Sequence, residues 1–186
     1  GGSKIPSDHP WGSCESGSSY LYEKWGNAQL GKHNLQIQIQ LMFSKIAEVM
    51  NYSATTTDLV EESLSGYFVP FRSPRLADLE DKAEAFSFAV DIWSTILAHI
   101  RPDLYICIDL ETFKRLRSLI CKTYGLPELK VQKYNTGWGK ITADIVEFGI
   151  NADIKLLRLP HLSTYKLFTC LKCNEQINQI FNEFCG

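Results

Sequence analysis

The residues best suited to chemistry lie close together near the end of the chain, around one histidine. His161 follows the apolar stretch LLRLP, and the hydroxyl residues Ser163 and Thr164 and the amine of Lys166 come soon after it. An imidazole donates a hydrogen bond or a proton, and hydroxyl and ammonium groups bind phosphate oxygens. In open α/β sheets, ligands bind in loops that directly follow a buried strand. The position therefore favours a working histidine over the alternative, a strand-end imidazole that bonds a backbone carbonyl.

A second group of polar and aromatic residues belongs to the segment FVPFRSPR. Arg72 has two interpretations of equal weight, a surface ion pair or a phosphate clamp that the neighbouring prolines hold rigid. Phe71 is the preferred platform for stacking a planar ring. Further aromatic residues fill the N-terminal stretch, where Trp11, Tyr20 and Trp25 either stack on a ligand or, as is more common in long loops, anchor the loop to the core.

Cys170 and Cys173 form a CxxC pair, which occurs in metal and redox sites. No second CxxC or histidine pair lies nearby, and a zinc site needs about four ligands. The residues around the pair have helical periodicity, so packing within a helix is the favoured interpretation and no metal is expected. The cysteines of the chain lie mostly in apolar segments, without a signal peptide, which predicts reduced thiols and a cytoplasmic location.

The bulk composition is typical of one globular domain. The chain has 186 residues, of which 45% are hydrophobic and 22% charged, and no apolar run approaches the ~20 residues that cross a membrane. The net charge of -2 gives no general electrostatic argument for nucleic acid, so a nucleic-acid-binding face has to be a local patch. No Walker, dinucleotide or G-x-S-x-G motif supports a small-molecule enzyme. We expect a monomer with a single domain over residues 1–186, including a long N-terminal loop at about 1–34.

Apolar periodicity places helices and strands around these polar residues. Helical spacing predicts helices at 35–50, 78–100, 111–124 and 164–184. Short apolar or alternating runs predict strands at 64–71, 104–108, 130–134, 141–148 and 156–159. NTGWG suits a tight turn between the third and the fourth of these strands. This order predicts an α/β fold, a three-layer α/β/α sandwich with a mainly parallel central sheet.

Polar segments fall at the carboxyl ends of the strands that are predicted to be parallel. They are VPFRSP after Tyr67 and Phe68, DLETF after 104–108, and PHLS after 156–159. Carboxyl ends of neighbouring parallel strands meet at one edge of a sheet, so these segments are expected to share one rim.

In these segments the chain resembles the uracil-DNA glycosylase superfamily. The resemblance rests on FVPFRSPR, on the helix-strand-helix block FSFAVDIWSTILAHIRPDLYICIDLETFKRLRSLI, and on LLRLPHLSTYKLF, which is similar to the family's strand that ends in a His-Pro-Ser loop. Together these segments span most of residues 64–168. The resemblance implies a divergent DNA glycosylase. Such an enzyme flips a nucleotide out of the helix, holds its base in a pocket and cleaves the N-glycosidic bond with water and no cofactor.

The resemblance also implies roles for individual residues. His161 matches the family's histidine and would donate to a base oxygen, while Leu162, at the place of a family proline, would act with Tyr165 as a wedge in the vacated stack. The residues expected to contact the DNA backbone are Ser163, Thr164, Lys166 and Arg75. The residues expected to bind the flipped nucleotide are Phe71, Tyr67, Phe68, Arg72, Ser73 and His9.

The sequence departs from the family in two places. No apolar strand precedes GGSKIPSDHP, so either the family's water-orienting residue is missing from this sequence or Asp8 or His9 supplies it. Asp8 is the preferred candidate, with an equally weighted alternative as a turn cap before Pro10. Tyr67 and Phe68 stand where the family often carries an Asn that reads the pyrimidine edge. Losing that reader favours a modified or unusual base over plain uracil.

The expected function is therefore excision of a modified or unusual base, in DNA repair or in defence against foreign modified DNA. The alternative is a catalytically inactive module of the same fold that binds nucleic acid or a protein partner. A salt-dependent affinity without turnover would distinguish the nucleic-acid version of that module from the enzyme.

Overall fold

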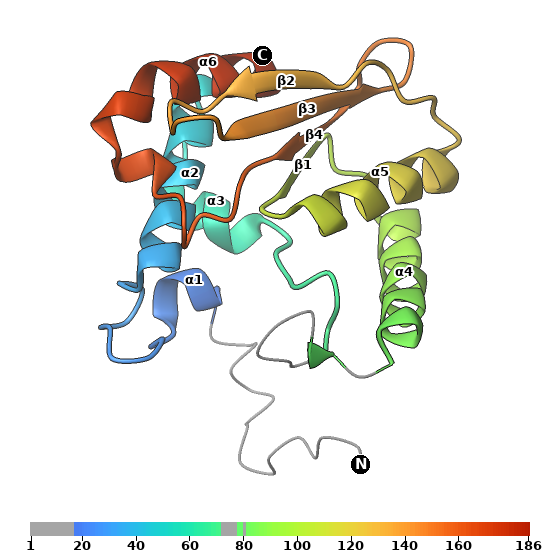
Figure 1. The fold of residues 1–186 in the computed structure, drawn as a ribbon, viewed down its shortest axis with the longest axis horizontal. Helices are drawn as coiled ribbons and strands as arrows, with labels where there is room; N and C mark the ends of the chain where they lie inside the picture. The colour runs from blue at the N-terminus through green and yellow to red at the C-terminus, as the bar shows by residue number, and fades with distance from the viewer. Residues whose placement is uncertain (1–16, 72–77, 80) are drawn as a thin grey trace.

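The computed structural model describes residues 17–71, 78–79 and 81–186. Within them the chain forms a mixed α/β fold with one open sheet and helices on both sides of it (Figure 1). The helices are α1 (Ser19–Tyr22), α2 (Asn34–Val49), α3 (Thr56–Glu62), α4 (Lys82–His99), α5 (Leu110–Tyr124) and α6 (Asn174–Cys185). The strands are β1 (Leu104–Cys107), β2 (Gln132–Asn135), β3 (Thr142–Phe148) and β4 (Ile154–Arg158).

The sheet is mixed, with the strand order β1-β4-β3-β2. β1 and β4 pair in parallel, whereas β3 is antiparallel to both β4 and β2. The predicted three-layer sandwich with a mainly parallel sheet is therefore not confirmed. The physical reason is the length of the connections, because the short turns at 136–141 and 149–153 can join only antiparallel neighbours, while α5 lies in the long crossover between β1 and the later strands.

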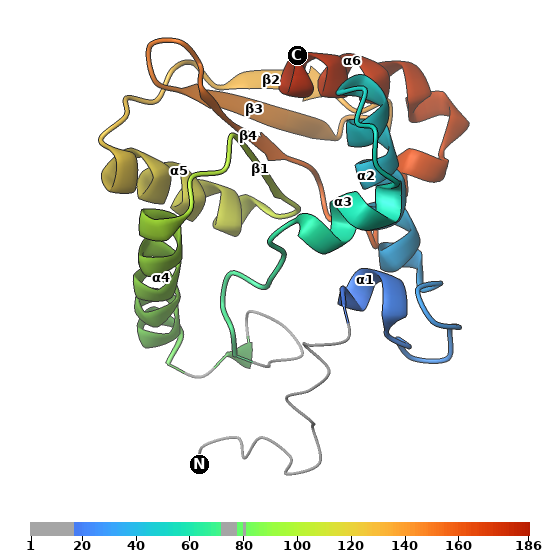
Figure 2. The same ribbon diagram turned by 180° about the vertical axis from the view of Figure 1, so that it is seen from behind.

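Side chains alternate between the two faces of the sheet and build a hydrophobic cluster on each. Leu157 and Ile145 belong to the cluster that includes α2 and α6, and Leu156 and Val146 to the one that includes α4 and α5. Figures 1 and 2 show the two pairs of helices on opposite sides of the sheet. β3 and β4 are buried along most of their length because they lie in the middle of the sheet. The sheet thus forms a rigid support with two covered faces.

Polar anchors inside α2 explain why the alternating stretch LQIQIQL is helical. The amides of Gln36 and Gln40 lie one turn apart and donate to backbone carbonyls within residues 19–31, at 2.7 to 2.9 Å. These bonds hold the N-terminal segment against the helix. Tyr20 packs against the core beneath it and touches Trp25, with ring centroids 5.6 Å apart. The interpretation as an anchor to the core is confirmed for Tyr20, while Trp25 contacts Tyr20 and His33.

Two predicted elements differ from the structure. Residues 64–71 form no strand, because within the described chain no neighbouring strand pairs with them, so that prediction was wrong. The predicted helix at 164–184 begins only at Asn174 and is preceded by 3-10 turns at Leu167–Thr169 and Leu171–Cys173. The reason is a competing hydrogen bond, since the backbone N–H of Phe168 donates to the buried side chain of Gln38, 2.9 Å away. The sequence reading also missed α3.

Candidate functional site at one edge of the sheet

Four strand ends meet at one edge of the sheet and bring the polar segments together. β1 and β4 run in parallel with Cys107 opposite Arg158, and the N–H of Leu159 donates to the Cys107 carbonyl at 2.9 Å beyond that pair. The prediction that DLETF and PHLS share a rim is confirmed. Because β3 runs against β4, the turn between β2 and β3 lies at the same edge. Asp109, at the end of β1, caps α5 by accepting a hydrogen bond from the Thr112 N–H at 2.7 Å.

His161 is exposed and its ring is held within the loop that follows β4. The hydroxyl Oγ of Ser163 lies 2.7 Å from Nδ1 of His161. The carbonyl of His161 accepts hydrogen bonds from the N–H groups of Thr164 and Tyr165, each at 3.0 Å, which closes the loop into one turn. Thr164 and Lys166 are exposed. The loop therefore presents an imidazole, a hydroxyl and an ammonium group to solvent, with the ring fixed through one of its nitrogens.

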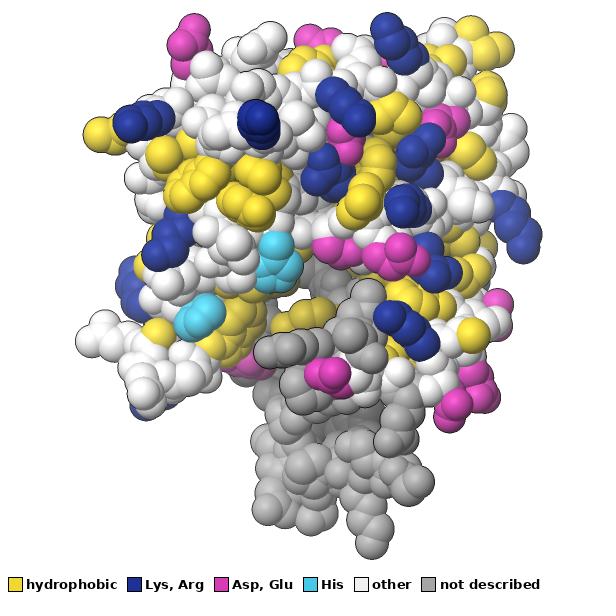
Figure 3. All heavy atoms as spheres, viewed as in Figure 1, with side chains coloured by type: hydrophobic (Ala, Val, Ile, Leu, Met, Phe, Trp, Pro, Cys, Tyr) yellow, Lys and Arg dark blue, Asp and Glu magenta, His cyan; other side chains and the backbone are white. Residues whose placement is uncertain are grey.

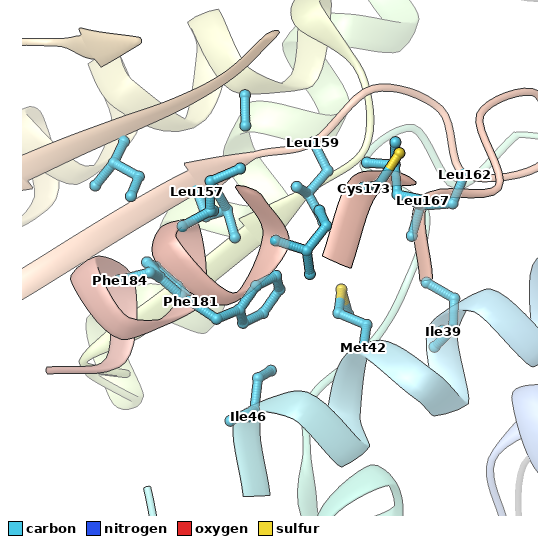
Figure 4. Packing of buried hydrophobic residues seen from close by; sticks show 14 residues of the cluster. Ile39, Met42, Ile46, Leu157, Leu159, Leu162, Leu167, Cys173, Phe181 and Phe184 are labelled. Atoms are coloured by element: carbon cyan, nitrogen blue, oxygen red, sulfur yellow. The ribbon is translucent and has the colours of Figure 1, made fainter. Parts of the chain in front are cut away.

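Leu162 does not occupy the position that a wedge requires. Its side chain is 0% exposed and packs in the cluster with Leu159, Leu167 and Cys173 (Figure 4). An inserting side chain has to project from the surface, so the assignment of Leu162 as a wedge is corrected to that of an apolar anchor. Tyr165 is half-buried and meets Trp138 of the β2–β3 turn edge to face, with ring centroids 6.2 Å apart. These apolar contacts fasten the loop from below and from the side.

A buried ion pair supports the edge, and the sequence reading missed it. Arg158 of β4 donates to Asp144 of β3 through Nε at 2.5 Å and to the carbonyl of Thr142 through Nη2 at 2.9 Å. Their side chains are only 13% and 7% exposed. The pair ties the last residue of β4, three positions before His161, to the start of β3. No local sequence pattern could have revealed it, because each strand also carries another charged residue, Glu147 in β3 and Lys155 in β4.

The other oxygen of this carboxylate, Oδ1 of Asp144, is buried without a hydrogen-bond partner among the described residues. Cys107 lies beside Arg158 on the same face of the sheet. Burial raises the pKa of the Cys107 thiol far above its usual range, and the carboxylates of Asp109 and Asp144 raise it further. A thiol in this condition stays protonated near neutral pH and is not a nucleophile.

The predicted base-binding residues of the segment 64–71 separate from one another. Phe68 is 8% exposed and its ring stacks on Trp93 of α4, with centroids 6.3 Å apart and an interplanar angle of 3°. Since it fills the core, its assignment to a base pocket is corrected. Tyr67 is 78% exposed, and Phe71, at 48%, lies against Phe88 with centroids 5.3 Å apart. The remaining candidates Asp8, His9, Arg72, Ser73 and Arg75 lie outside the described residues.

The structure assigns the CxxC pair to packing. Cys173 is 0% exposed within the cluster under the His161 loop. In the described part of the chain no group of three or more His, Cys, Asp or Glu side chains is arranged to hold a metal ion. Over the same residues, no helix combines the length and the apolar character needed to cross a membrane.

Comparison of the chain with protein-family models, with curated proteins and with solved structures yields no match.

Proposed function

We propose that this protein is a DNA glycosylase that excises a modified or unusual base, with His161 as the group that stabilises the departing base. The observation that carries the proposal is the placement of His161. It is exposed, it follows the buried strand β4 at the edge where β1 also ends, and Ser163 holds its Nδ1. A fixed donor of this kind is what the cleavage of an N-glycosidic bond requires, because negative charge develops on the base as it leaves.

The Ser163 hydroxyl sets the direction in which the imidazole can donate. When Oγ donates to Nδ1, the ring proton of the neutral imidazole sits on Nε2. Nε2 then donates to an oxygen of the base, and the hydrogen bond strengthens as that oxygen gains charge. Water serves as the nucleophile, so no cofactor is part of the proposal. Thr164 and Lys166, exposed on the same turn, bind phosphates on either side of the flipped nucleotide.

The buried ion pair of Arg158 and Asp144 is a positioning element in this scheme. It joins β4 to β3 just before the chain leaves the sheet, so the turn that carries His161 starts from a fixed point. Leu162 and Leu167 add apolar anchors on either side of the exposed groups. Asp8 keeps its proposed role of orienting water, and His9, Arg72, Ser73 and Arg75 keep theirs in binding the nucleotide and its backbone.

A second candidate function is binding of nucleic acid without chemistry. It is favoured by the core position of Phe68, since a residue that fills the core leaves one fewer group to read a base. The Thr164 and Lys166 contacts would persist in such a module, while the histidine would have no departing base to stabilise.

The proposal includes three further properties of the chain. The described cysteines are free thiols, which suits a reducing compartment such as the cytoplasm. Helices on both faces of the sheet are what a three-layer arrangement requires, with a mixed rather than a mainly parallel sheet in its middle. A monomer is the proposed working form.

The test is base release from oligonucleotides that carry a panel of modified pyrimidines. We expect abasic product from at least one of them, and we expect His161→Ala to lower the rate by about 10²- to 10³-fold. His99→Ala is the matched control, because His99 is also exposed but lies at the end of α4. A folded protein that releases no base from any member of the panel would overturn the enzyme proposal, and retained DNA binding would then favour the binding module.

A further inference from the structure

A groove lies at the same edge of the sheet, where β2 and the turn after it face α6. Its volume is about 700 Å³. It is lined from the strand and turn by Lys133, Asn135 and Gly139, and from the start and side of α6 by Lys172, Gln176 and Gln179. The described residues that line it carry two ammonium groups and no carboxylate. In a chain of net charge -2, this groove is a local basic surface.

The charge along the groove is graded. Gln176, Gln179 and Glu183 lie at helical spacing and share one side of α6, and Lys172 stands in the 3-10 turn just before the helix. Burial and the carboxylates of Glu183 and Glu147 raise the pKa of Tyr134, and Glu183 lies near the end of α6. The helix begins at the other end, beside Lys172, where the helix dipole places partial positive charge. In Figure 3, Lys and Arg side chains are spread over the upper part of the molecule, with Asp and Glu side chains among them.

The floor of the groove is built by close packing. Gly137 has φ +81° and faces the segment before α6, where an added Cβ would lie 2.8 Å from the Cα of Cys173 and from the carbonyl of Lys172. Only glycine permits this approach, so the turn and the start of α6 are held in contact. Oε1 of Gln176 is buried at this contact without a hydrogen-bond partner among the described residues.

Two aromatic residues connect the turn that borders the groove with the His161 loop. Trp138 stands between the two glycines of the turn and contacts Tyr165, four residues after His161. Both rings are half-buried and keep part of their surface in solvent. A basic groove beside partly exposed aromatic rings is the arrangement that binds unpaired nucleic-acid strands, in which phosphates meet ammonium groups and bases stack on rings.

We propose that this groove binds the phosphodiester backbone of an unpaired DNA strand, with Lys133 and Lys172 neutralising its phosphates. This inference rests on the proposed function, because both take DNA as the ligand. It adds the substrate class: DNA that is unpaired next to the nucleotide bound at His161. The two contacts do not depend on any chemistry at His161.

The experiment measures binding of a fluorescent single-stranded oligodeoxynucleotide to the full chain across a salt series. The double variant Lys133→Gln/Lys172→Gln should bind about tenfold more weakly, and its slope of log K against log salt should fall by about 1.4, at about 0.7 for each lost contact. The matched control Lys114→Gln/Lys122→Gln removes the same charge from exposed positions on α5 and should leave the slope unchanged. Inorganic phosphate should compete only weakly, because it lacks the neighbouring phosphates and bases.

Equal slopes for both double variants would overturn the proposal. The proposal would also be overturned if inorganic phosphate bound as tightly as the oligonucleotide. The same holds if binding of duplex DNA depended on Lys133 and Lys172 while binding of the single strand did not. Failure of the proposed function is seen separately. If the protein releases no base but its DNA binding depends on Lys133 and Lys172, the glycosylase proposal is wrong and the proposal for the groove still holds.

Discussion

The loop after β4 and the segment 64–71 are attached to the molecule in different ways. The loop is fastened at several points. Leu162 and Leu167 are fully buried, Tyr165 contacts Trp138, and the following backbone is bonded to the side chain of Gln38. Of its exposed groups, Thr164 and Lys166 stand between these anchors, and His161 stands between Leu162 and the fully buried Leu159 that follows β4.

The segment 64–71 is attached through Phe68 and the neighbouring Val69, which is partly buried against the same cluster. Phe68 enters the core and stacks on Trp93, whose Nε1 donates to the Phe68 carbonyl at 3.0 Å. Leu64 and Tyr67 on one side and Phe71 on the other are exposed. No described strand pairs with the segment, so its backbone lacks the hydrogen bonds that fix β4 on both sides.

The difference indicates where precise chemistry is feasible on this molecule. A catalytic group has to be held within a fraction of an ångström, which takes several independent constraints on its own short stretch of chain. The loop after β4 meets that requirement and the segment 64–71 does not. For this reason His161 is the proposed hydrogen-bond donor, and specificity is sought from other parts of the same edge.

The largest expected effect comes from removing the ion pair under the loop. Asp144→Ala leaves Arg158 largely buried without its carboxylate, and we expect the free energy of unfolding to fall by about 4 kcal/mol. Urea unfolding followed by circular dichroism measures it. Replacing both partners with apolar residues, as Asp144→Leu/Arg158→Met, should recover most of the loss, because no charge then remains buried.

The surface pair Lys45–Glu48 is the control for that measurement. The side chain of Glu48 is 68% exposed, and Glu48→Ala should cost less than about 1 kcal/mol. If Asp144→Ala costs no more than Glu48→Ala, the ion pair does not support β4 and the comparison between the two regions loses its basis.

The same contrast explains which features could be predicted from sequence. The helix at 110–124 and the strand at 154–158 follow from local periodicity, together with the Asp109 cap and Gly125 in the left-handed conformation. Periodicity alone cannot give strand direction or partners. For that reason the apolar run 64–71 was mistaken for a strand and the sheet for a mainly parallel one. The hydrogen bonds of Gln38 and the pairing of Arg158 with Asp144 connect residues distant in sequence, and no local pattern reveals them.

The next largest expected effect comes from removing Phe68, the buried residue of the segment 64–71. Phe68→Ala should lower the free energy of unfolding by about 3 kcal/mol, because it removes a buried ring and leaves a cavity beside Trp93. Tyr67→Ala, one residue away and 78% exposed, should change it by less than about 0.5 kcal/mol. Urea unfolding of both variants measures the two losses in the free energy of unfolding and so compares them. Similar losses for the two variants would show that the exposed Tyr67 holds the segment as firmly as Phe68 does.

The smallest expected effect is a difference in thiol reactivity between the two regions. Burial, together with the neighbouring Cys170, raises the pKa of the Cys173 thiol to about 11, and the thiol lies under the anchored loop. The new thiol in Tyr67→Cys, at an exposed position, should have a pKa of about 8.5. At about pH 8, iodoacetamide should therefore modify Cys173 about 100-fold more slowly than the new thiol, as followed by peptide mass spectrometry.

The raised pKa of Cys173 also makes the free energy of unfolding depend on pH. Folding favours the protonated form of Cys173, so its contribution to stability is complete below about pH 9 and is lost as pH rises toward 11. The alkylation rate of Cys173 should rise about tenfold per pH unit over that interval while the rate of the Tyr67→Cys thiol has already levelled off. Equal rates at about pH 8 would mean that the backbone around Cys173 opens as readily as the segment 64–71. The loop above it would then be no better placed than that segment to hold a catalytic imidazole.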